Sequence, residues 1–518
     1  MRAPRHRNRT VPAAATLAAV LVGCSHVTQR PELRTLAEAP APGPDTTLLK
    51  AHMRSGDVYL ITSWQVVDSG ASLDGTGVRY DAWRVRADSG HFTLPADSIA
   101  LLETNVAESH YPFGLQALGF LTVVYGAVSA ACLADPKSCF GSCPTFYVED
   151  GTREVLQAEG FSASVARVLE ASDVDPLYAA RPSGRRFAVV MRNEAQETHV
   201  VRSVRLRVVP RPADGRVFAT ADGRYYAVPR VAAPAACTAP EGDCLAAVRA
   251  LDTLERRSLT DSSDLAARET VELDFPAVPG PAGVVLGARH TFVSTYLFYQ
   301  TLAYMGRSAG EWLAQLERMG PDRMPQALGL MKALGGIEIA VLDPDGSWRR
   351  IGTYDEAGPI ATDVQIFPLG DVPRAERVHV RLRMARGSWR IGYVALAGGT
   401  VPATARTLDP VAVERGGVAD HTALEALTDS ARYLTAFPGD AYRIVFRLPA
   451  DYGTYELFLE SRGYYYEWIR NEWLAEENPL MVALVLADPG EALRRLAGPF
   501  KQVEPRMETL FWQSRFGR

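Results

Sequence analysis

Apolar and polar residues alternate with a period of two through much of this 518-residue chain. Val204, Leu206 and Val208, for example, are separated by Arg205 and Arg207. A strand places successive side chains on opposite faces, so this pattern predicts strands with one buried face. Asp-Gly pairs, which are common in tight hairpin turns, separate these alternating stretches. We therefore predict a β-rich α+β fold, with a small N-terminal barrel or sheet module followed by β-sandwich-like modules and a helical insert.

The N-terminus carries the pattern of an export signal. Four arginines, at positions 2, 5, 7 and 9, precede an apolar stretch at 11–23. A basic start followed by a short apolar stretch is typical of a secretory signal peptide. The stretch is shorter than the roughly 20 residues that a membrane-spanning helix needs.

The residues that close this stretch, Leu21-Val22-Gly23-Cys24, resemble the lipobox of bacterial lipoproteins. The resemblance implies that Cys24 becomes the first residue of the mature chain and carries lipid, including palmitate-type acyl chains. More than one acyl chain gives stable membrane anchoring. Ser25 follows Cys24, and the lack of Asp there implies outer-membrane placement under the family's sorting rule. We expect an exported protein, held by lipid in the cell envelope, with its body in the periplasm; an ordinary cleaved signal is the alternative.

Composition argues against nucleic acid as a partner. The formal net charge is −5, and removing the four arginines of the signal peptide makes it −9. A nucleic-acid surface needs a clustered basic excess, which the sequence does not show. With 47% apolar and 22% charged residues, the chain is an ordinary globular protein able to bury several cores.

The five cysteines after Cys24 suit disulfides, which an exported chain permits. Cys237 and Cys244 bracket a short loop that one bridge would close. Cys139 and Cys143 flank Phe-Gly-Ser, and a bridge between them would leave Cys132 as a buried thiol, although Cys132 with Cys139 is the other pairing. Zinc normally takes four ligands, and this cluster lacks a fourth, so we expect no metal and no cofactor.

The patterning divides the chain into consecutive segments. These are a signal peptide at 1–23, a lipid-attached flexible tether at 24–48, a small β module at 49–110, an apolar helix at 111–135, a β-rich module at 136–290, a helical insert at 291–335, a β-sandwich-like module at 336–400 and an α/β C-terminal module at 401–518. The tether is polar and rich in Pro. In the insert, a helix at 324–334 should end at Gly335-Gly336, and a further helix is predicted over 421–434 with Asp420 as its cap.

The segment 112–134 has no charged residue and is long enough to span a bilayer. Gly and Ala are frequent in it, however, and Gln116 lies inside it. A second membrane element would also divide a lipid-tethered body between two compartments. We favour a helix buried in or docked on the folded body, with an interfacial or spanning helix as the alternative.

A string that follows this segment, Cys-Pro-x-x-Tyr-x-x-Asp-Gly at 143–151, resembles one in bacterial envelope proteins without an assigned function. The strings at 193–199 and 463–468 are similar to the same group. The resemblance covers most of the mature chain but rests on short patterns. It implies no catalytic residues.

A short pattern also recurs within the chain. The alternating run at 271–275, a Pro/Gly turn and an apolar run ending in the aromatic string at 295–299 are echoed at 442–446, 455–459 and 464–468. Two interpretations stay open at this point. The recurring pattern reflects either an ancestral duplication of a sandwich edge or the residue pattern that β-hairpins commonly share.

The common catalytic motifs are absent from the sequence. It has no Gly-x-Ser-x-Gly, no phosphate-binding Gly-x-x-x-x-Gly-Lys and no His-Glu-x-x-His. His199, with Glu194 and Glu197 nearby, could act in acid–base chemistry, but a solvated strand start or turn is the simpler interpretation. We therefore assign no catalytic residue.

An aromatic string is the candidate binding surface. Its members are Tyr464, Tyr465, Tyr466, Trp468 and Trp473. Tyr and Trp join a large apolar area to a polar group, which suits interfaces and stacking on sugar rings. The alternative is that some members simply fill a core.

These observations favour a non-enzymatic, lipid-anchored binding or scaffold protein whose partner is another envelope component, either a protein or a glycan. The alternative is an envelope hydrolase with dispersed acid–base residues. Convergence of His199, His290 or His421 with carboxylates in one open pocket would favour the hydrolase. Aromatic residues near 465 on a concave surface would favour glycan or peptide binding.

Overall fold

The structure is a computed structural model. It describes residues 26–34, 39, 49–53, 57–80, 86–110, 143–165, 167–195, 197–306, 329–356, 358–371, 377–450, 454–467 and 476–513. Several of the predicted features therefore lie outside the described residues, namely Cys24, the segment 112–134, Cys132, Cys139, Trp468 and Trp473. The β-rich α+β class with sandwich-like modules is confirmed.

The chain divides into two compact units, and the described part of the first is one antiparallel sheet. Its strands in spatial order are β1 (His26–Arg34), β6 (Ile99–His110), β2 (Leu49–Met53), β3 (Val58–Val67), β4 (Ser72–Tyr80) and β5 (Arg86–Pro95). Apolar residues such as Leu49, Ile61, Leu73 and Leu102 form its core. Of the two predicted forms, barrel or sheet, the described strands make an open sheet.

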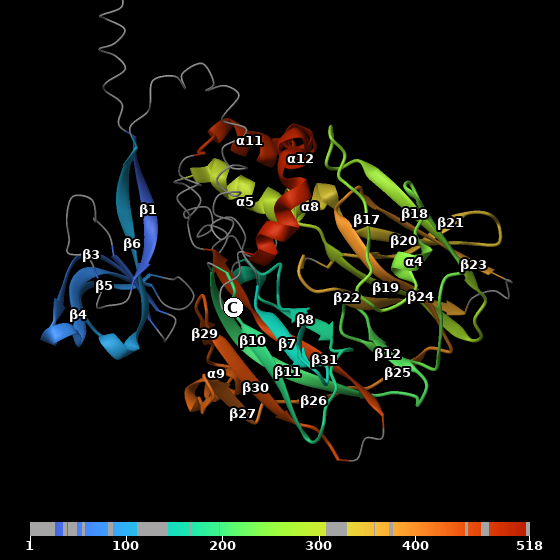
Figure 1. The fold of residues 1–518 in the computed structure, drawn as a ribbon, viewed down its shortest axis with the longest axis horizontal. Coiled ribbons are helices and arrows are strands. Elements are labelled where there is room, and N and C mark those ends of the chain that lie inside the picture. The colour runs from blue at the N-terminus through green and yellow to red at the C-terminus, as the bar shows by residue number, and fades with distance from the viewer. Residues whose placement is uncertain are drawn as a thin grey trace, which may run out of the picture. The chain divides into compact units, whose positions relative to one another are not determined.

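The second unit contains two β-sandwiches, which the strand labels in Figure 1 locate. In sandwich 1, sheet 1A consists of β28 (Val418–Ala419), β27 (Ala412–Arg415), β30 (Ala441–Arg447), β10 (Arg186–Arg192), β7 (Thr145–Glu149) and β8 (Glu154–Glu159). Sheet 1B consists of β26 (Arg406–Leu408), β11 (Glu197–Pro210), β31 (Tyr455–Glu467) and β9 (Ala171–Pro176), with β29 (Leu434–Ala436) attached to β11. The predicted alternation of Val204, Leu206 and Val208 buries these side chains between the two sheets.

Sandwich 2 is built in the same way. Sheet 2A consists of β16 (Gly242–Asp243), β15 (Ala236–Ala239), β18 (Arg268–Pro276), β23 (Arg377–Ala385), β20 (Ile337–Leu342) and β21 (Trp348–Tyr354). Sheet 2B consists of β14 (Arg230–Ala232), β24 (Trp389–Gly398), β19 (Pro281–His290), β22 (Asp363–Asp371), β12 (Arg216–Ala219), β13 (Tyr225–Val228) and β25 (Val401–Ala403), with β17 (Arg256–Arg257) attached to β24. β18 and β23 face β19 and β24 across one apolar core.

The two sandwiches have the same strand order, apart from β12, β13 and β25 of sheet 2B, which have no equivalent in sandwich 1. Sheet 1A, β28-β27-β30-β10-β7-β8, matches sheet 2A, β16-β15-β18-β23-β20-β21, position by position. In sheet 1B, β11 lies between β26 and β31, with β9 beyond and β29 attached. In sheet 2B, β24 lies in the same way between β14 and β19, with β22 beyond and β17 attached. The short helices α9 (His421–Thr428) and α4 (Leu245–Val248) also occupy matching places in the chain order.

This match is the one that a tandem duplication with exchanged halves would produce. One copy contains β7–β11 and then β14–β19, and the other contains β20–β24 and then β26–β31. Each sandwich combines the first half of one copy with the second half of the other. The echoed runs at 271–275 and 442–446 are β18 and β30, which hold equivalent positions, so the topology favours the duplication over ordinary hairpins. The string at 295–299, expected in a strand, is helical instead.

A group of helices lies beside the sandwiches in Figure 1. It consists of α5 (Val293–Met305), α8 (Gly329–Leu334), α11 (Pro479–Ala487) and α12 (Pro489–Gln513), which share one apolar core. α8 ends at Gly335, as predicted, where φ is +64°. α9 begins at His421 with Asp420 accepting a hydrogen bond from the Ala423 amide, but it ends at Thr428 because Leu434 belongs to β29. Among the described helices, none is long and apolar enough to cross a membrane.

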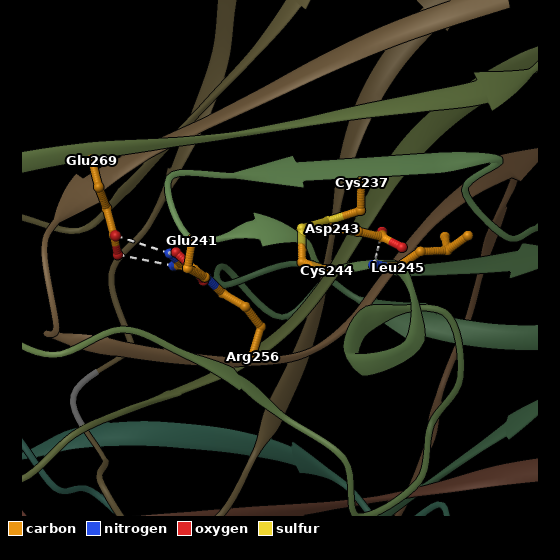
Figure 2. The surroundings of a disulfide bond; sticks show 7 residues. All are labelled: Cys237, Glu241, Asp243, Cys244, Leu245, Arg256 and Glu269. Atoms are coloured by element: carbon orange, nitrogen blue, oxygen red, sulfur yellow. Dashed lines mark hydrogen bonds and ion pairs between the residues drawn. A yellow bond between two sulfur atoms is a disulfide. The ribbon is translucent and has the colours of Figure 1, made fainter.

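The predicted disulfide Cys237–Cys244 is confirmed and joins β15 to the start of α4 (Figure 2). The loop that it closes contains Glu241, which forms a two-point ion pair with Arg256 at 2.6 and 2.9 Å. Arg256 also forms a two-point pair with Glu269 of β18, at 2.9 and 2.8 Å. The disulfide loop is therefore fixed to both sheets of sandwich 2.

The exchanged topology predicts the behaviour of the separated copies. We expect fragments 143–335 and 336–518 to associate one to one when they are co-expressed, because each fragment supplies the missing half of both sandwiches. Expressed alone, each should show no cooperative unfolding transition. Size-exclusion chromatography and thermal melts would test this, and a single fragment that melts cooperatively as a monomer would contradict it.

Candidate functional site

A pocket of about 420 Å³ lies where α5 and α8 meet strand ends from both sandwiches. Sandwich 1 contributes the end of β8, the start of β11 and Tyr465 of β31. Sandwich 2 contributes the end of β19, the loop after β21 and the start of β24. Pockets of a few hundred Å³ with a few converging polar groups are typical of small-molecule sites.

The pocket has a buried interior and an exposed rim. Glu159, Glu197 and Trp389 line it and are at most 3% exposed. Lys332 and Asp355 also line it but are solvent-exposed, which places them at the opening. Any ligand that enters would thus pass one acidic and one basic group before it reaches a water-poor interior.

Glu159, the last residue of β8, is held by backbone amides. Its Oε2 accepts hydrogen bonds from the amides of Ile360 at 2.7 Å and Ala361 at 3.3 Å. Gly358 permits this approach, because a Cβ there would lie 2.6 Å from the same oxygen. Burial, reinforced by the charge of Glu356, raises the pKa of Glu159 to about 7 despite those amides. The carboxyl group is therefore close to half protonated at neutral pH.

More acidic side chains lie on β9 and β22, which contact each other. Burial raises the pKa of Asp363 to about 7, and the charge of Glu356 adds to the effect. Burial likewise raises the pKa values of Asp173 and Asp175, with added repulsion from Asp363 and Glu356. No group of three or more His, Cys, Asp or Glu side chains among the described residues is arranged to hold a metal ion.

His290, at the end of β19, lines the pocket together with Glu159 and Glu356. Its ring stacks on Trp389 with 3.8 Å between ring centroids. Nδ1 lies 3.2 Å from the carbonyl oxygen of Ser388, and the ring also hydrogen-bonds the backbone of Glu356. Burial lowers the pKa of His290 to about 4. The imidazole is thus neutral at pH 7 and engaged with the backbone, which suits positioning better than proton transfer.

Arg289, the residue before His290, is held in place by a cluster of ion pairs. Arg289 forms a two-point pair with Glu255, both contacts at 2.7 Å, and reaches Glu508 of α12 at 3.1 Å. Arg390, its neighbour on β24, shares the same two carboxylates. In sandwich 1, the equivalent strands carry Arg462 and Arg202 on the shared carboxylate of Glu170.

The string at 193–199 forms a buried polar network at the turn between β10 and β11. His199 Nε2 lies 2.7 Å from Glu197 Oε1, and both side chains are fully buried. Glu194 accepts hydrogen bonds from Thr145 and Tyr147 of β7, at 2.7 and 2.9 Å. The expected solvated strand start is therefore wrong. Glu197 reaches the pocket, whereas His199 is not among its lining residues.

The structure separates the members of the candidate aromatic surface. Tyr464 is fully buried and packs edge-on against Tyr433 and Tyr466, so it fills the core, as the second interpretation of the string expects, and is not part of a binding surface. Tyr466 is half-buried. Tyr465 lines the pocket, and its hydroxyl donates to the carbonyl oxygen of Ser162 at 3.1 Å. One predicted residue thus belongs to a concave surface.

Other predicted residues lie away from the pocket. His421 is exposed at the start of α9, and Cys143 is buried on the pocket wall. Sequence reasoning missed Glu159, Glu356 and Trp389 as pocket residues. Spacing gave no signal for them, because they come from three separate strand ends that only the tertiary fold brings together.

No protein-family model matches this sequence, and no curated protein matches it. Two solved structures are weakly similar. A GH31 alpha-xylosidase from Xanthomonas citri matches with 8% identity over 84% of this chain and 38% of its own, at a TM-score of 0.15. The structure of the infectious bursal disease virus Gx strain matches with 9% identity over 92% and 91%, at a TM-score of 0.11. Scores this low carry no argument about fold or function.

The buried carboxyls predict how stability depends on pH. Glu159 and Asp363 have pKa values of about 7 in the folded chain, above their ordinary values, so their stabilisation is complete at low pH and is lost as pH rises through 7. We expect the free energy of unfolding to fall by about 1 kcal/mol for each group between pH 6 and pH 8. His290 opposes this below about pH 6.5, because its pKa is lowered.

Denaturant melts at pH 6 and pH 8 would measure this dependence. Glu159→Gln should reduce the difference by about 1 kcal/mol. Glu272→Gln, on the exposed side of β18, serves as the matched control and should leave it unchanged. A Glu159→Gln protein with the full pH dependence would show that Glu159 does not titrate between pH 6 and pH 8.

Proposed function

We propose that this chain is a lipid-anchored envelope protein that binds another envelope component without transforming it, through the pocket at the junction of the two sandwiches. Support comes first from the pocket itself, which joins buried carboxylates to aromatic faces in a volume of about 420 Å³. The lipid-bearing residue would be Cys24, which follows the lipobox-like string. The binding role would place Tyr465, from the predicted aromatic string, against the ligand.

A hydrolase is the second candidate, and two observations favour it. Glu159, with a pKa of about 7, lies under the electrostatic influence of Glu356. A carboxyl whose pKa is raised beside a second carboxylate suits proton donation in glycoside hydrolysis. The second is that His290 lines the pocket together with Glu159 and Glu356, which is the convergence expected of a hydrolase. Against the hydrolase, burial lowers the pKa of the imidazole and the ring is bonded to the backbone. A binding role therefore requires fewer assumptions about the pocket side chains than a catalytic role does.

The anchor is tested by Cys24→Ala. We expect this change to abolish labelling by a radioactive or clickable fatty acid and to move the protein out of the membrane fraction, because the acylated thiol is removed. Ser25→Ala provides the control and should keep both properties. A membrane fraction that does not change in Cys24→Ala would shift the anchoring to the segment 112–134.

The pocket is tested by obstruction. Ala163 is exposed and lines the pocket, so Ala163→Trp should fill the opening without disturbing a core. Using the full chain in detergent, we expect at least a tenfold loss of binding to solubilised envelope glycan or peptide fragments. Ala213→Trp, at an exposed turn away from the pocket, should bind normally. Equal binding by both variants would exclude the pocket, and product release that Glu159→Gln abolishes would favour the hydrolase.

A further inference from the structure

Two buried carboxylates of the pocket already have partners within the chain. Glu159 Oε2 accepts hydrogen bonds from the amides of Ile360 and Ala361, and Glu197 Oε1 lies 2.7 Å from His199 Nε2. A charged ligand would lose its hydration on entering a water-poor interior, and these two carboxylates would have to exchange existing partners to compensate for that loss. The interior therefore favours a ligand without net charge.

Two further polar side chains of the pocket are engaged in the same way. His290 Nδ1 lies 3.2 Å from the carbonyl oxygen of Ser388, and burial lowers the pKa of His290 to about 4, so that the ring is uncharged at pH 7. The hydroxyl of Tyr465 donates to the carbonyl oxygen of Ser162 at 3.1 Å. A ligand rich in polar groups would compete with these hydrogen bonds, whereas a mostly apolar ligand would leave them intact.

The indole N–H of Trp389 is the exception among these groups. Trp389 lines the pocket and is 1% exposed, and its N–H finds no acceptor within the part of the chain that the structure describes. The ring stacks on His290 and packs edge-on against Tyr354, and these contacts hold the indole in the pocket wall. A buried donor without an acceptor is unfavourable. A ligand with an acceptor oxygen would remove that penalty.

The rest of the pocket wall is largely apolar. Val165, Phe298 and Met331 line the pocket and are half-buried, so part of their apolar surface is left for a ligand to cover. Tyr299 and Tyr465 add aromatic rings from α5 and β31. Removing apolar surface from water is favourable, and aromatic rings pack well against other flat rings. The walls therefore suit a flat apolar body.

From these features we propose that the pocket binds an uncharged molecule with a flat apolar body and one carbonyl oxygen, which accepts a hydrogen bond from the indole N–H of Trp389. This inference rests on the proposed binding function and narrows it to one class of ligand. The apolar body covers the half-buried side chains of the walls. The carbonyl oxygen supplies the acceptor that the described residues do not, and the lack of charge leaves the partners of Glu159 and Glu197 in place.

Equilibrium dialysis of the full chain in detergent at pH 7 would test the ligand class with four probes of nearly equal shape. These are acetylnaphthalene, which has the carbonyl, isopropenylnaphthalene, which has no oxygen, the anion naphthoate and the cation naphthylethylamine, all substituted at the same ring carbon. The Ala163→Trp protein in the same detergent measures binding to micelles, which is subtracted. Acetylnaphthalene should bind roughly fivefold more tightly than isopropenylnaphthalene, because a buried donor gains its acceptor. It should bind roughly tenfold more tightly than either charged probe.

A variant and a spectroscopic measurement isolate the indole N–H. Trp389→Phe keeps an aromatic ring but removes the donor, so it should bind acetylnaphthalene and isopropenylnaphthalene with nearly equal affinity. Because the ratio is measured within one variant, a general loss of affinity through repacking cancels. Trp348→Phe, on β21 and outside the pocket lining, is the matched control and should keep the preference. In the unaltered protein, the carbonyl stretch of bound acetylnaphthalene should lie at a lower wavenumber than in an apolar solvent, because the oxygen accepts a hydrogen bond.

The possible outcomes separate this ligand class from the function on which it rests. Equal binding of acetylnaphthalene and isopropenylnaphthalene, or a carbonyl stretch like that in an apolar solvent, would overturn the role of Trp389. Tighter binding of a charged probe, or no probe bound above the Ala163→Trp background, would overturn the uncharged ligand class. If Ala163→Trp still lost the envelope fragments, the pocket would remain the binding site for a different ligand. If it bound them normally, the proposed pocket function itself would fail.

Discussion

The strands of the second unit can bury their apolar faces only against strands from the other copy of the repeated segment. The two sandwiches of this unit depend on that exchange. β10 pairs with β30 along its full length, and Arg185 donates to the carbonyl oxygen of Leu448, 263 residues further along the chain. The core of sandwich 1 therefore combines side chains from the first and last quarters of the described second unit, such as Phe146 and Leu459. Exchange of this kind is known from swapped dimers, and here one chain contains both partners.

The exchange also explains why like charges meet. Residues near the centre of a swapped pair lie close to their own counterparts, as residues do across a two-fold interface. The similar strings Ser172-Asp173-Val174 and Thr362-Asp363-Val364 lie on β9 and at the start of β22. Burial, with the charges of Glu356 and Asp363, raises the pKa of Asp173. Glu159 ends the β7–β8 hairpin and Glu356 follows the equivalent β20–β21 hairpin, and burial together with the charge of Glu356 raises the pKa of Glu159. Acidic side chains from equivalent strands thus gather at the junction of the two sandwiches, beside the pocket.

The sequence indicated local structure well and tertiary structure poorly, for physical reasons. Alternation of buried and exposed residues predicts β18 and β23 because their outward side chains are polar. The closure of a short loop predicts Cys237–Cys244, since that contact is local. The exchange of halves cannot be predicted from the sequence, because the apolar–polar pattern of a strand is the same whichever strand it pairs with. The apolar spacing of Leu493, Leu496, Phe500 and Val503 could have revealed α12, but the prolines at 499 and 505 obscure its helical pattern.

The distance along the chain between partner strands has a consequence for how the protein is made. Ribosomes add roughly 5–20 residues per second, so β10 would wait on the order of ten seconds or more for β30. During that interval the apolar faces of β7, β10 and β11 have no sheet to cover them, and unpaired strands of this kind aggregate. Long-range pairing also slows folding after synthesis is complete. A chain with this topology cannot complete sandwich 1 until its C-terminal third has emerged.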